Sequence, residues 1–212
     1  MKMNMADWDI YCLTDAGLSR GRSTVTVVSE MLKAGATVIQ YREKDKKAGE
    51  MFEECLAIRE LTRQAGCCFI VNDHIEIAML CDADGVHIGQ EDLPVASVRQ
   101  LIGDDKIIGL STHSPEQCRA AIKAGVDYIG VGPVFFTKTK KDVCDPVGFE
   151  YLDYVVGNHS IPFVAIGGIK AGNIKEVASH GARCCALVSE IVGADDIADM
   201  LRGLRSVIAE FR

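Results

Sequence analysis

Residues 107–131 read IIGLSTHSPEQCRAAIKAGVDYIGV and contain one strand–helix–strand unit. Two apolar runs of strand length, 107–111 and 128–131, flank a stretch that begins with Ser114-Pro115-Glu116. This triplet is typical of a helix start, because serine caps the first turn and proline is favoured at the first helical position. A strand, a helix and a second strand in succession predict a βαβ unit with parallel strands.

The same alternation continues along the whole chain. The eight predicted strands span residues 9–14, 37–42, 68–72, 85–88, 107–111, 128–131, 163–166 and 184–188. Stretches of helical period separate them, such as the one that carries Met51, Cys55 and Ile58 on one stripe. Eight such units in 212 residues predict a single-domain (β/α)8 TIM barrel of the α/β class over residues 1–212. An open doubly wound sheet is the alternative, but no Gly-x-Gly-x-x-Gly motif follows the first strand.

Composition and charge exclude several classes of protein. Hydrophobic residues make up 48% of the chain and charged residues 25%, as in ordinary globular proteins. The net charge of −7 argues against a nucleic-acid partner. No apolar stretch approaches the roughly 20 residues of a membrane span, and the first residues lack a secretory signal, so we expect a cytoplasmic protein without a membrane partner. Nine cysteines, an odd number, without a C-x-x-C motif predict free, buried thiols in a reducing compartment.

In a TIM barrel, the loops that follow the strands form the active site. The second predicted strand continues into Gln40, Arg42 and Lys44 on one face and Tyr41 and Glu43 on the other, because successive side chains of a strand alternate. The charge run could also lie on the solvated surface. At the mouth of a barrel, however, two cations and an amide on one face predict an anion site.

Two aspartates follow the third and fourth predicted strands. Asp73 and Asp92 lie on adjacent units, so the fold would bring their carboxylates close together. A lone aspartate is often only a turn or helix cap. A pair of carboxylates without nearby His or Cys ligands suits Mg²⁺, which completes its shell with water and substrate phosphates.

A second group of polar and glycine residues follows the last three predicted strands. It comprises Thr137, Thr139 and Lys140 after the sixth strand, Gly167 and Gly168 after the seventh, and the Val188–Ser189 turn at the end of the eighth. Loops after strands seven and eight commonly bind phosphate in this fold, because backbone N–H groups at a helix start face the anion. A Gly-Gly pair alone is also typical of a tight turn. Its position predicts a second phosphate site.

The histidines and the loop cysteine carry less information. His87 lies within a predicted strand and is interpreted as a packed core residue. His74 and His113 follow strands, and substrate contact by either stays open. Cys144 lies in the long loop without an evident histidine partner, and we assign it no role.

Six segments form a specific ordered pattern. They are YCLTD at 11–15, QYREK at 40–44, VND at 71–73, DGVHIGQEDLP at 84–94, GPVFFTKTK at 132–140 and AIGGI at 165–169. Along nearly its whole length the chain resembles the thiamine-phosphate synthase family. Two departures are Phe136, where the family more often has proline, and Cys184-Cys185, where smaller residues are expected. They are expected to change loop stiffness and thiazole-pocket packing rather than the chemistry.

The resemblance implies a barrel transferase with two small-molecule substrates and Mg²⁺ as cofactor. It would join 4-amino-2-methyl-5-hydroxymethylpyrimidine diphosphate to 4-methyl-5-(2-phosphoethyl)thiazole, or to its carboxylated form, and release diphosphate. The implied contacts are Gln40, Arg42, Lys44, Asn72, Ser111 and Lys140 for the pyrimidine diphosphate; Thr137, Thr139, Gly168, Val188 and Ser189 for the thiazole phosphate; and Asp73 and Asp92 for the metal.

The implied chemistry is a dissociative substitution. Diphosphate would leave the pyrimidine methylene, and the thiazole nitrogen would capture that carbon. Arg42, Lys44 and Lys140 would act as catalytic residues by neutralising charge on the leaving group, with no protein nucleophile. A thiazole tautomerase of the same barrel family and a non-catalytic phosphate-binding barrel are the alternatives. The sequence selects no oligomeric state, and a homo-oligomer stays open.

Overall fold

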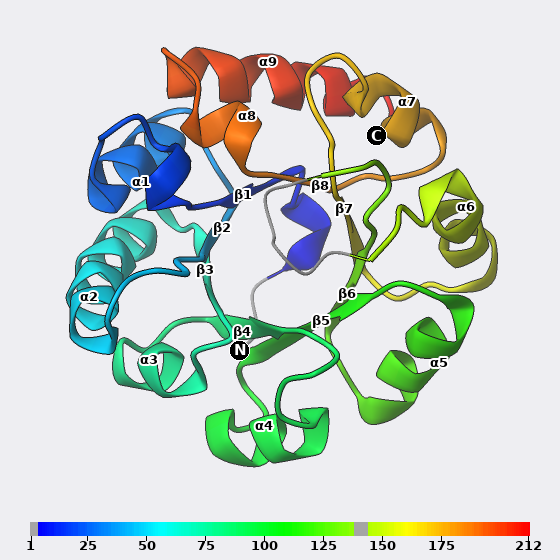
Figure 1. The fold of residues 1–212 in the computed structure, drawn as a ribbon, viewed down its shortest axis with the longest axis horizontal. Coiled ribbons are helices and arrows are strands. Elements are labelled where there is room, and N and C mark those ends of the chain that lie inside the picture. Colours follow the sequence, from blue (N-terminus) through cyan, green and yellow to red (C-terminus); the bar gives the residue numbers. More distant parts are fainter. Residues whose placement is uncertain (1–3, 138–143) are drawn as a thin grey trace.

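The computed structural model describes residues 4–137 and 144–212, which form a closed barrel of eight parallel strands surrounded by helices (Figure 1). The strands are β1 (Ile10–Leu13), β2 (Val38–Tyr41), β3 (Cys68–Asn72), β4 (Gly85–Ile88), β5 (Ile107–Thr112), β6 (Tyr128–Val131), β7 (Phe163–Ile166) and β8 (Cys185–Leu187). Each strand pairs with the next, and β8 closes the barrel onto β1. The predicted TIM barrel is confirmed, and the open doubly wound sheet is excluded.

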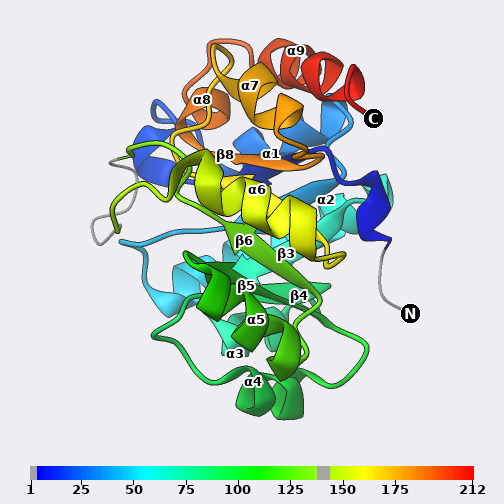
Figure 2. The same cartoon turned by 90° about the vertical axis from the view of Figure 1, so that its right-hand side faces the viewer.

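The helices follow the strands in turn, and the short turn at residues 5–7 (dark blue) lies on the same side of the molecule as the C-terminal end of the chain (Figure 2). They are α1 (Thr24–Lys33), α2 (Ala48–Ala65), α3 (Ile75–Leu80), α4 (Val95–Ile102), α5 (Pro115–Ala124), α6 (Gly148–Asn158), α7 (Ile174–Ser179), α8 (Ser189–Val192) and α9 (Ile197–Ala209), with 3-10 turns η1 (Met5–Asp7) and η2 (Ala16–Leu18). The domain bounds of 1–212 stay a prediction.

The predicted helix start, with Ser114 as the cap and Pro115 in the first turn, is confirmed. The Ser114 hydroxyl accepts the N–H of Gln117, and Pro115 occupies the first helical position of α5. Gly125 ends that helix in the left-handed conformation. Local sequence therefore determines both ends of this helix.

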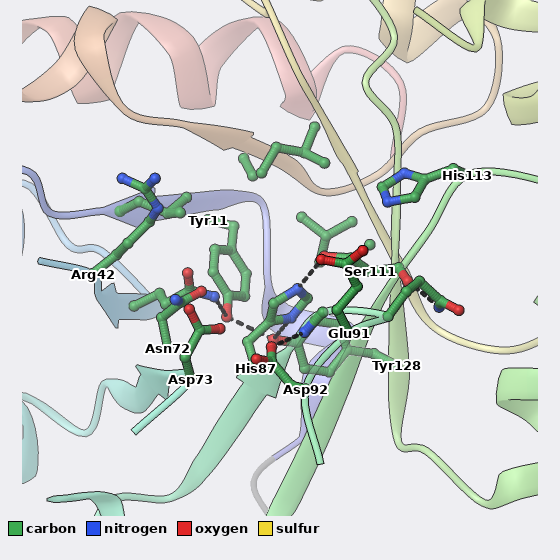
Figure 3. A pocket seen from close by; sticks show the side chains of 18 of the residues that line it. Tyr11, Arg42, Asn72, Asp73, His87, Glu91, Asp92, Ser111, His113 and Tyr128 are labelled. Carbon is green, nitrogen blue, oxygen red and sulfur yellow. Dashed lines mark hydrogen bonds between the residues drawn. The ribbon is translucent and has the colours of Figure 1, made fainter. Parts of the chain in front are cut away.

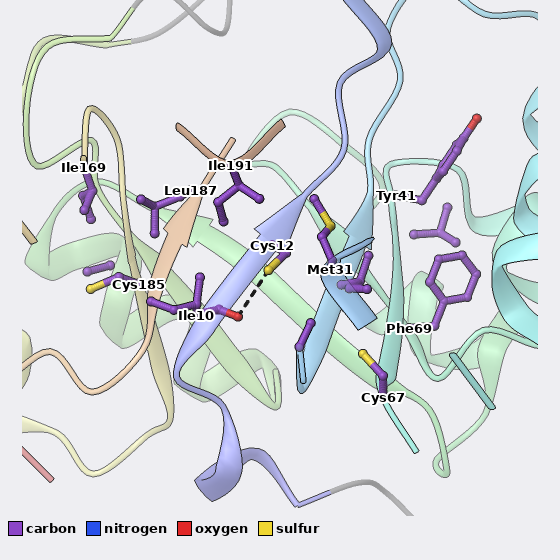
Figure 4. Packing of buried hydrophobic residues seen from close by; sticks show 14 of the residues in the cluster. Ile10, Cys12, Met31, Tyr41, Cys67, Phe69, Ile169, Cys185, Leu187 and Ile191 are labelled. Atoms are coloured by element: carbon purple, nitrogen blue, oxygen red, sulfur yellow. Dashed lines mark hydrogen bonds between the residues drawn. The ribbon is translucent and has the colours of Figure 1, made fainter. Parts of the chain in front are cut away.

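The core has two layers, and strand alternation separates them. Ile10 and Cys12 of β1 point outward into the larger layer between barrel and helices, which is shown in Figure 4. Tyr11 and Leu13 point inward into a smaller cluster within the barrel. Trp8, which precedes β1, belongs to the same cluster. Its ring packs edge-on against the rings of Tyr11 and Tyr128, with centroid distances of 5.6 and 5.3 Å.

The cysteines have the predicted character. All nine are free; Cys144 is exposed, and the other eight are buried. The buried thiols behave as small hydrophobic side chains in both core layers. No helix among the described residues is long and apolar enough to span a membrane.

Candidate active site

The end of β2 determines the polar face of the site. Gln40, Arg42 and Lys44 line the cavity at the mouth of the barrel. Tyr41 and Glu43 point the other way, and the Tyr41 hydroxyl donates to Glu54 Oε2 at 2.6 Å outside the barrel. The predicted alternation is confirmed.

The outward carboxylate holds this loop in place. Glu43 is buried and accepts the N–H of Ala16 at 3.0 Å and the hydroxyl of Thr24 at 3.3 Å. Burial raises the pKa of Glu43, although the Ala16 N–H and the Lys46 charge oppose the shift. The Thr14 hydroxyl also accepts the N–H of Arg42 at 2.9 Å. These contacts fix the backbone that carries the inward cations.

The first cavity has a volume of about 550 Å³, within the range of small-molecule sites (Figure 3). The structure brings seven of the predicted residues to its wall: Gln40, Arg42, Lys44, Asn72, Asp73, Asp92 and Ser111. Arg42 is largely buried, and its guanidinium lies 3.3 Å from Asp15 Oδ2. Lys44 Nζ lies 2.9 Å from Asp73 Oδ2. The cavity therefore holds a cationic and a carboxylate group side by side.

Asp73 occupies an unusual backbone conformation. Its φ of 60° lies in the left-handed region, which is uncommon for a residue other than glycine. Its N–H donates to His87 O at 2.9 Å, which continues the β3–β4 ladder by one bond. Burial would raise the pKa of Asp73, but the hydrogen bond and charge of Lys44, helped by His87 and Asp92, lower it. The carboxyl group is therefore an anion.

Asp92 reaches the same cavity from the loop after β4. Its Oδ2 accepts the N–H of Gly89 at 2.6 Å, so the carboxylate also closes its own turn. Among the described residues no cluster of three or more His, Cys, Asp or Glu side chains could hold a metal. A pair of carboxylates still fits Mg²⁺, which needs only one or two from the protein.

Several pocket residues were not identified from the sequence, and three of them are hydrogen-bonded to one another. Tyr11, Tyr128 and His87 form the pocket floor, connected by hydrogen bonds of 2.7 Å between the two hydroxyls and 2.9 Å from Tyr128 to His87 Nδ1. The interpretation of His87 as a packed core residue is wrong, because its half-buried ring lines the cavity. Strand alternation, applied to β1 from Leu13 backwards, would have placed Tyr11 inside the barrel.

A second cavity of about 530 Å³ lies beside the first. Four of the five contacts that the family resemblance implies for the thiazole phosphate line it, Thr137, Gly168, Val188 and Ser189, together with Gly167. Its remaining wall is largely apolar and includes Leu18, Phe136 and Ile169. Arg42, Ser111 and His113 line both cavities. Ligands in the two cavities would therefore meet at a shared wall.

The glycine pair after β7 allows the loops after β6 and β7 to lie close together. Gly168 has a φ of 64°, and a Cβ atom there would lie 2.7 Å from Phe136 O. Gly167 has a φ of 100°, and its Cβ would lie 2.4 Å from Pro133 Cα. Any other residue would push the loops after β6 and β7 apart. The pair is both a tight turn and a part of the second cavity.

The remaining histidines and cysteines differ in whether they line a cavity. His74 pairs with Glu76 at 3.0 Å and lines neither cavity, whereas His113 lines both. Cys144 lines the first cavity. Cys184 and Cys185 line neither cavity, whereas Ala186 and Leu187 of the same segment line the second; the expected effect of this segment on pocket packing stays a prediction. Thr139 and Lys140 lie outside the described residues.

Comparison with known proteins decides the family. The model of the thiamine monophosphate synthase family matches residues 10–191. The chain belongs to this family. It is 65% identical over 201 residues to the thiamine-phosphate synthase of Pelotomaculum thermopropionicum, and the match covers 95% of this chain and 92% of that protein. It is 59% identical over 202 residues to the thiamine-phosphate synthase of Lawsonia intracellularis, with 95% and 93% covered.

A solved structure has the same barrel. Thiamine phosphate pyrophosphorylase from Pyrococcus furiosus matches with a TM-score of 0.89 and 37% identity, over 98% of each chain. The predicted membership of the thiamine-phosphate synthase family is thereby confirmed. The roles of individual site residues stay predictions.

Proposed function

We propose that this chain is a thiamine-phosphate synthase. It joins 4-amino-2-methyl-5-hydroxymethylpyrimidine diphosphate to 4-methyl-5-(2-phosphoethyl)thiazole, or to the carboxylated thiazole, and releases diphosphate. One observation carries the proposal: a polar cavity with two cations and three carboxylates, among them Asp73 and Asp92, shares a wall with a more apolar cavity near the β7 and β8 loops. Two substrates can meet there.

The polar cavity would hold the diphosphate. Arg42 and Lys44 face it from the loop after β2, and Lys140 would join them from outside the described residues. As the bond to the pyrimidine methylene breaks, negative charge grows on the leaving diphosphate. Fixed cations favour that charged state, and losing one such donor costs about 3–4 kcal/mol of transition-state stabilisation. These residues would therefore be the catalytic ones.

Asp73 and Asp92 would hold Mg²⁺ beside the diphosphate. The donor set fits this ion: two oxygen ligands on adjacent loops, one with a lowered pKa, at the wall of the cavity that holds the cations. When bound, the ion supplies positive charge that neutralises part of the diphosphate. Lys44 already contacts Asp73, so the ion and the lysine would share that carboxylate.

The second cavity would hold the thiazole phosphate. Thr137, Gly168, Val188 and Ser189 would contact the phosphate, with Thr139 from outside the described residues. Gln40, Asn72 and Ser111 would bind the pyrimidine in the first cavity. The shared wall at Arg42 and Ser111 would place the thiazole nitrogen next to the methylene carbon that loses diphosphate. No protein nucleophile is required.

The cellular setting is part of the proposal. All nine cysteines are free, which suits a reducing cytoplasm. The net charge of −7 suits small-molecule substrates held by a local cationic cluster rather than a nucleic-acid partner, and we propose no membrane partner. A homo-oligomer stays open.

Product formation tests the proposal. The purified protein is incubated with the pyrimidine diphosphate, the thiazole phosphate and Mg²⁺, with and without EDTA, and thiamine phosphate is followed by mass-resolved chromatography. We expect product that EDTA abolishes. A folded sample that forms no product while a thiazole tautomer equilibrates would indicate the tautomerase, and ligand binding without any reaction would indicate a binding protein.

A further inference from the structure

A chain of hydrogen bonds crosses the pocket floor from Gln40 to Ser111. Gln40 Nε2 donates to the Tyr11 hydroxyl at 3.0 Å, and the hydroxyls of Tyr11 and Tyr128 lie 2.7 Å apart. Tyr128 Oη lies 2.9 Å from His87 Nδ1, and His87 Nε2 lies 2.9 Å from Ser111 Oγ. The two ends of this relay face the cavity proposed for the pyrimidine.

Counting hydrogens gives the relay a direction at its Gln40 end. The amide nitrogen of Gln40 can only donate. Tyr11 is fully buried in the barrel, and among the described residues Tyr128 Oη is the one acceptor for its hydroxyl hydrogen. If Tyr128 donated to Tyr11 instead, the Tyr11 hydrogen would be buried without a partner, which costs free energy. Tyr11 therefore donates to Tyr128.

The direction then passes to the other end. Tyr128 accepts from Tyr11, and among the described residues His87 Nδ1 is the other hydrogen-bond partner of its buried hydroxyl, so the Tyr128 hydrogen goes to His87 Nδ1. A neutral imidazole that accepts at Nδ1 holds its hydrogen at Nε2, which donates to Ser111 Oγ. The Ser111 hydroxyl keeps its hydrogen for a ligand. At the opposite end, the bond to Tyr11 orients the Gln40 amide with Nε2 toward the relay, which leaves the carbonyl oxygen on the other side of the amide for a ligand.

The phenols are suited to this task. Burial raises the pKa of both Tyr11 and Tyr128, so each keeps its hydrogen at physiological pH. The rings also cannot move freely. Trp8 packs edge-on against both, and a Cβ atom at Gly109 would lie 2.1 Å from Tyr128 Cζ. The relay is held by close packing on at least two sides.

We propose that Tyr11, Tyr128 and His87 are positioning residues that determine base specificity. Their relay orients the Gln40 amide so that its carbonyl oxygen, and the Ser111 hydroxyl so that its hydrogen, is left for a ligand in the cavity. This inference rests on the proposed function, because it concerns the pyrimidine half of that reaction.

The fixed pattern selects one chemistry of the ring. An amino group donates to the Gln40 carbonyl oxygen, and an unprotonated ring nitrogen accepts from the Ser111 hydroxyl. The oxo counterpart, in which C=O and N–H replace the amino group and its neighbouring nitrogen, has nearly the same shape but the opposite pattern. A site with fixed polar groups rejects such an analogue strongly, because its buried groups are left unpaired.

Binding measurements with two ligands test the specificity. Calorimetry compares the 4-amino-pyrimidine diphosphate with its 4-oxo counterpart in the wild type, Tyr128→Phe and Tyr151→Phe. The last is a matched control, because Tyr151 is also a buried tyrosine whose hydroxyl is hydrogen-bonded, to Thr112 Oγ1 at 2.7 Å, but it lines neither cavity.

We expect the wild type to prefer the amino ligand by at least about 100-fold. Tyr128→Phe should narrow that preference about tenfold, and Tyr151→Phe should leave it within about twofold. Equal preference in Tyr128→Phe and the wild type, with both proteins folded, would overturn the relay. Wild-type product formation in the chromatographic assay is measured in parallel. A missing product would then indicate that the proposed function is wrong, whereas an unchanged ligand preference in Tyr128→Phe would indicate that the relay is wrong.

A spectroscopic test needs no ligand and no activity. Long-range ¹H–¹⁵N correlation on histidine-labelled protein identifies which ring nitrogen carries hydrogen, and His87→Gln assigns the signal. We expect the Nε2–H form in the wild type and in Tyr151→Phe, and a mixture of both forms in Tyr128→Phe. An Nδ1–H form in the wild type would reverse the direction of the relay and contradict the inference.

Discussion

Lys44 and Lys46 are two residues apart on the same loop, yet the structure predicts opposite consequences for their replacement by methionine. Lys44 faces the cavity and pairs with Asp73 at 2.9 Å, with the two side chains 47% and 30% exposed. Lys46 faces outward and lies 2.6 Å from Glu54 Oε1, with side chains 14% and 17% exposed. Methionine keeps an apolar stem at either position, so the change removes mainly the charge.

The exposures set the size of each effect on stability. An exposed ion pair contributes about 0.2–1 kcal/mol, so Lys44→Met should lower the free energy of unfolding by no more than about 1 kcal/mol. Breaking a buried pair costs about 3–5 kcal/mol, and because the Lys46 pair is not fully buried we expect about 2–4 kcal/mol. At about 2–4 °C per kcal/mol for a chain of this size, Lys46→Met should lower the Tm by about 4–16 °C.

Activity should change in the opposite sense. Lys44→Met removes a cation that would stabilise the leaving diphosphate, so kcat/KM should fall by about 100-fold or more. Lys46→Met, measured at 25 °C where it stays folded, should keep kcat/KM within about threefold. Denaturant unfolding and initial rates of thiamine phosphate formation give both quantities. Unchanged activity in Lys44→Met, or a loss of activity in folded Lys46→Met as large as that in Lys44→Met, would contradict these roles of the two lysines.

Three further outcomes follow from the structure. The pKa of Glu43 is raised above its ordinary value of 4.5. The stability that Glu43 contributes is therefore complete below pH 4.5 and is lost as the pH rises through its raised pKa. In denaturant titrations, the free energy of unfolding of Glu43→Gln should rise relative to that of the wild type between pH 4.5 and 7. Cys144 is the exposed thiol and lines the first cavity, so a thiol reagent should label about one cysteine per native chain, and the pyrimidine diphosphate should slow that labelling; rapid labelling in Cys144→Ser would contradict this. Lys140→Ala should keep its fold by circular dichroism and lose turnover about 100-fold, and near-normal turnover would count against its role.

Sequence reasoning succeeded where a local pattern carries the information. The period of two along β2 placed Gln40, Arg42 and Lys44 on the cavity side, because alternation needs no knowledge of neighbouring strands. Strand ends were less well predicted. The eighth strand was expected to include Cys184 and Val188 but spans Cys185–Leu187, since Val188 has a ψ of −85° and leads into α8.

The pocket floor could not be predicted in the same way. Tyr11 and Tyr128 are 117 residues apart, and His87 meets them from a third strand. Strand alternation places a residue inside the barrel, but the strand tilt and register decide which inward residues meet across it. His87 was therefore assigned to the core from its strand position, although its neighbours make it part of the cavity.

The central claim is that two substrates react with each other in one composite pocket. ³¹P NMR of a reaction with the pyrimidine diphosphate, the thiazole phosphate and Mg²⁺ tests this claim most directly, with Arg42→Ala as the comparison. We expect diphosphate and thiamine phosphate to appear in equal amounts in the wild type, and at least about 100-fold more slowly in Arg42→Ala. Two results would contradict this proposal. One is release of diphosphate without formation of thiamine phosphate, and the other is a mixture in which the pyrimidine diphosphate is not consumed and no thiamine phosphate forms.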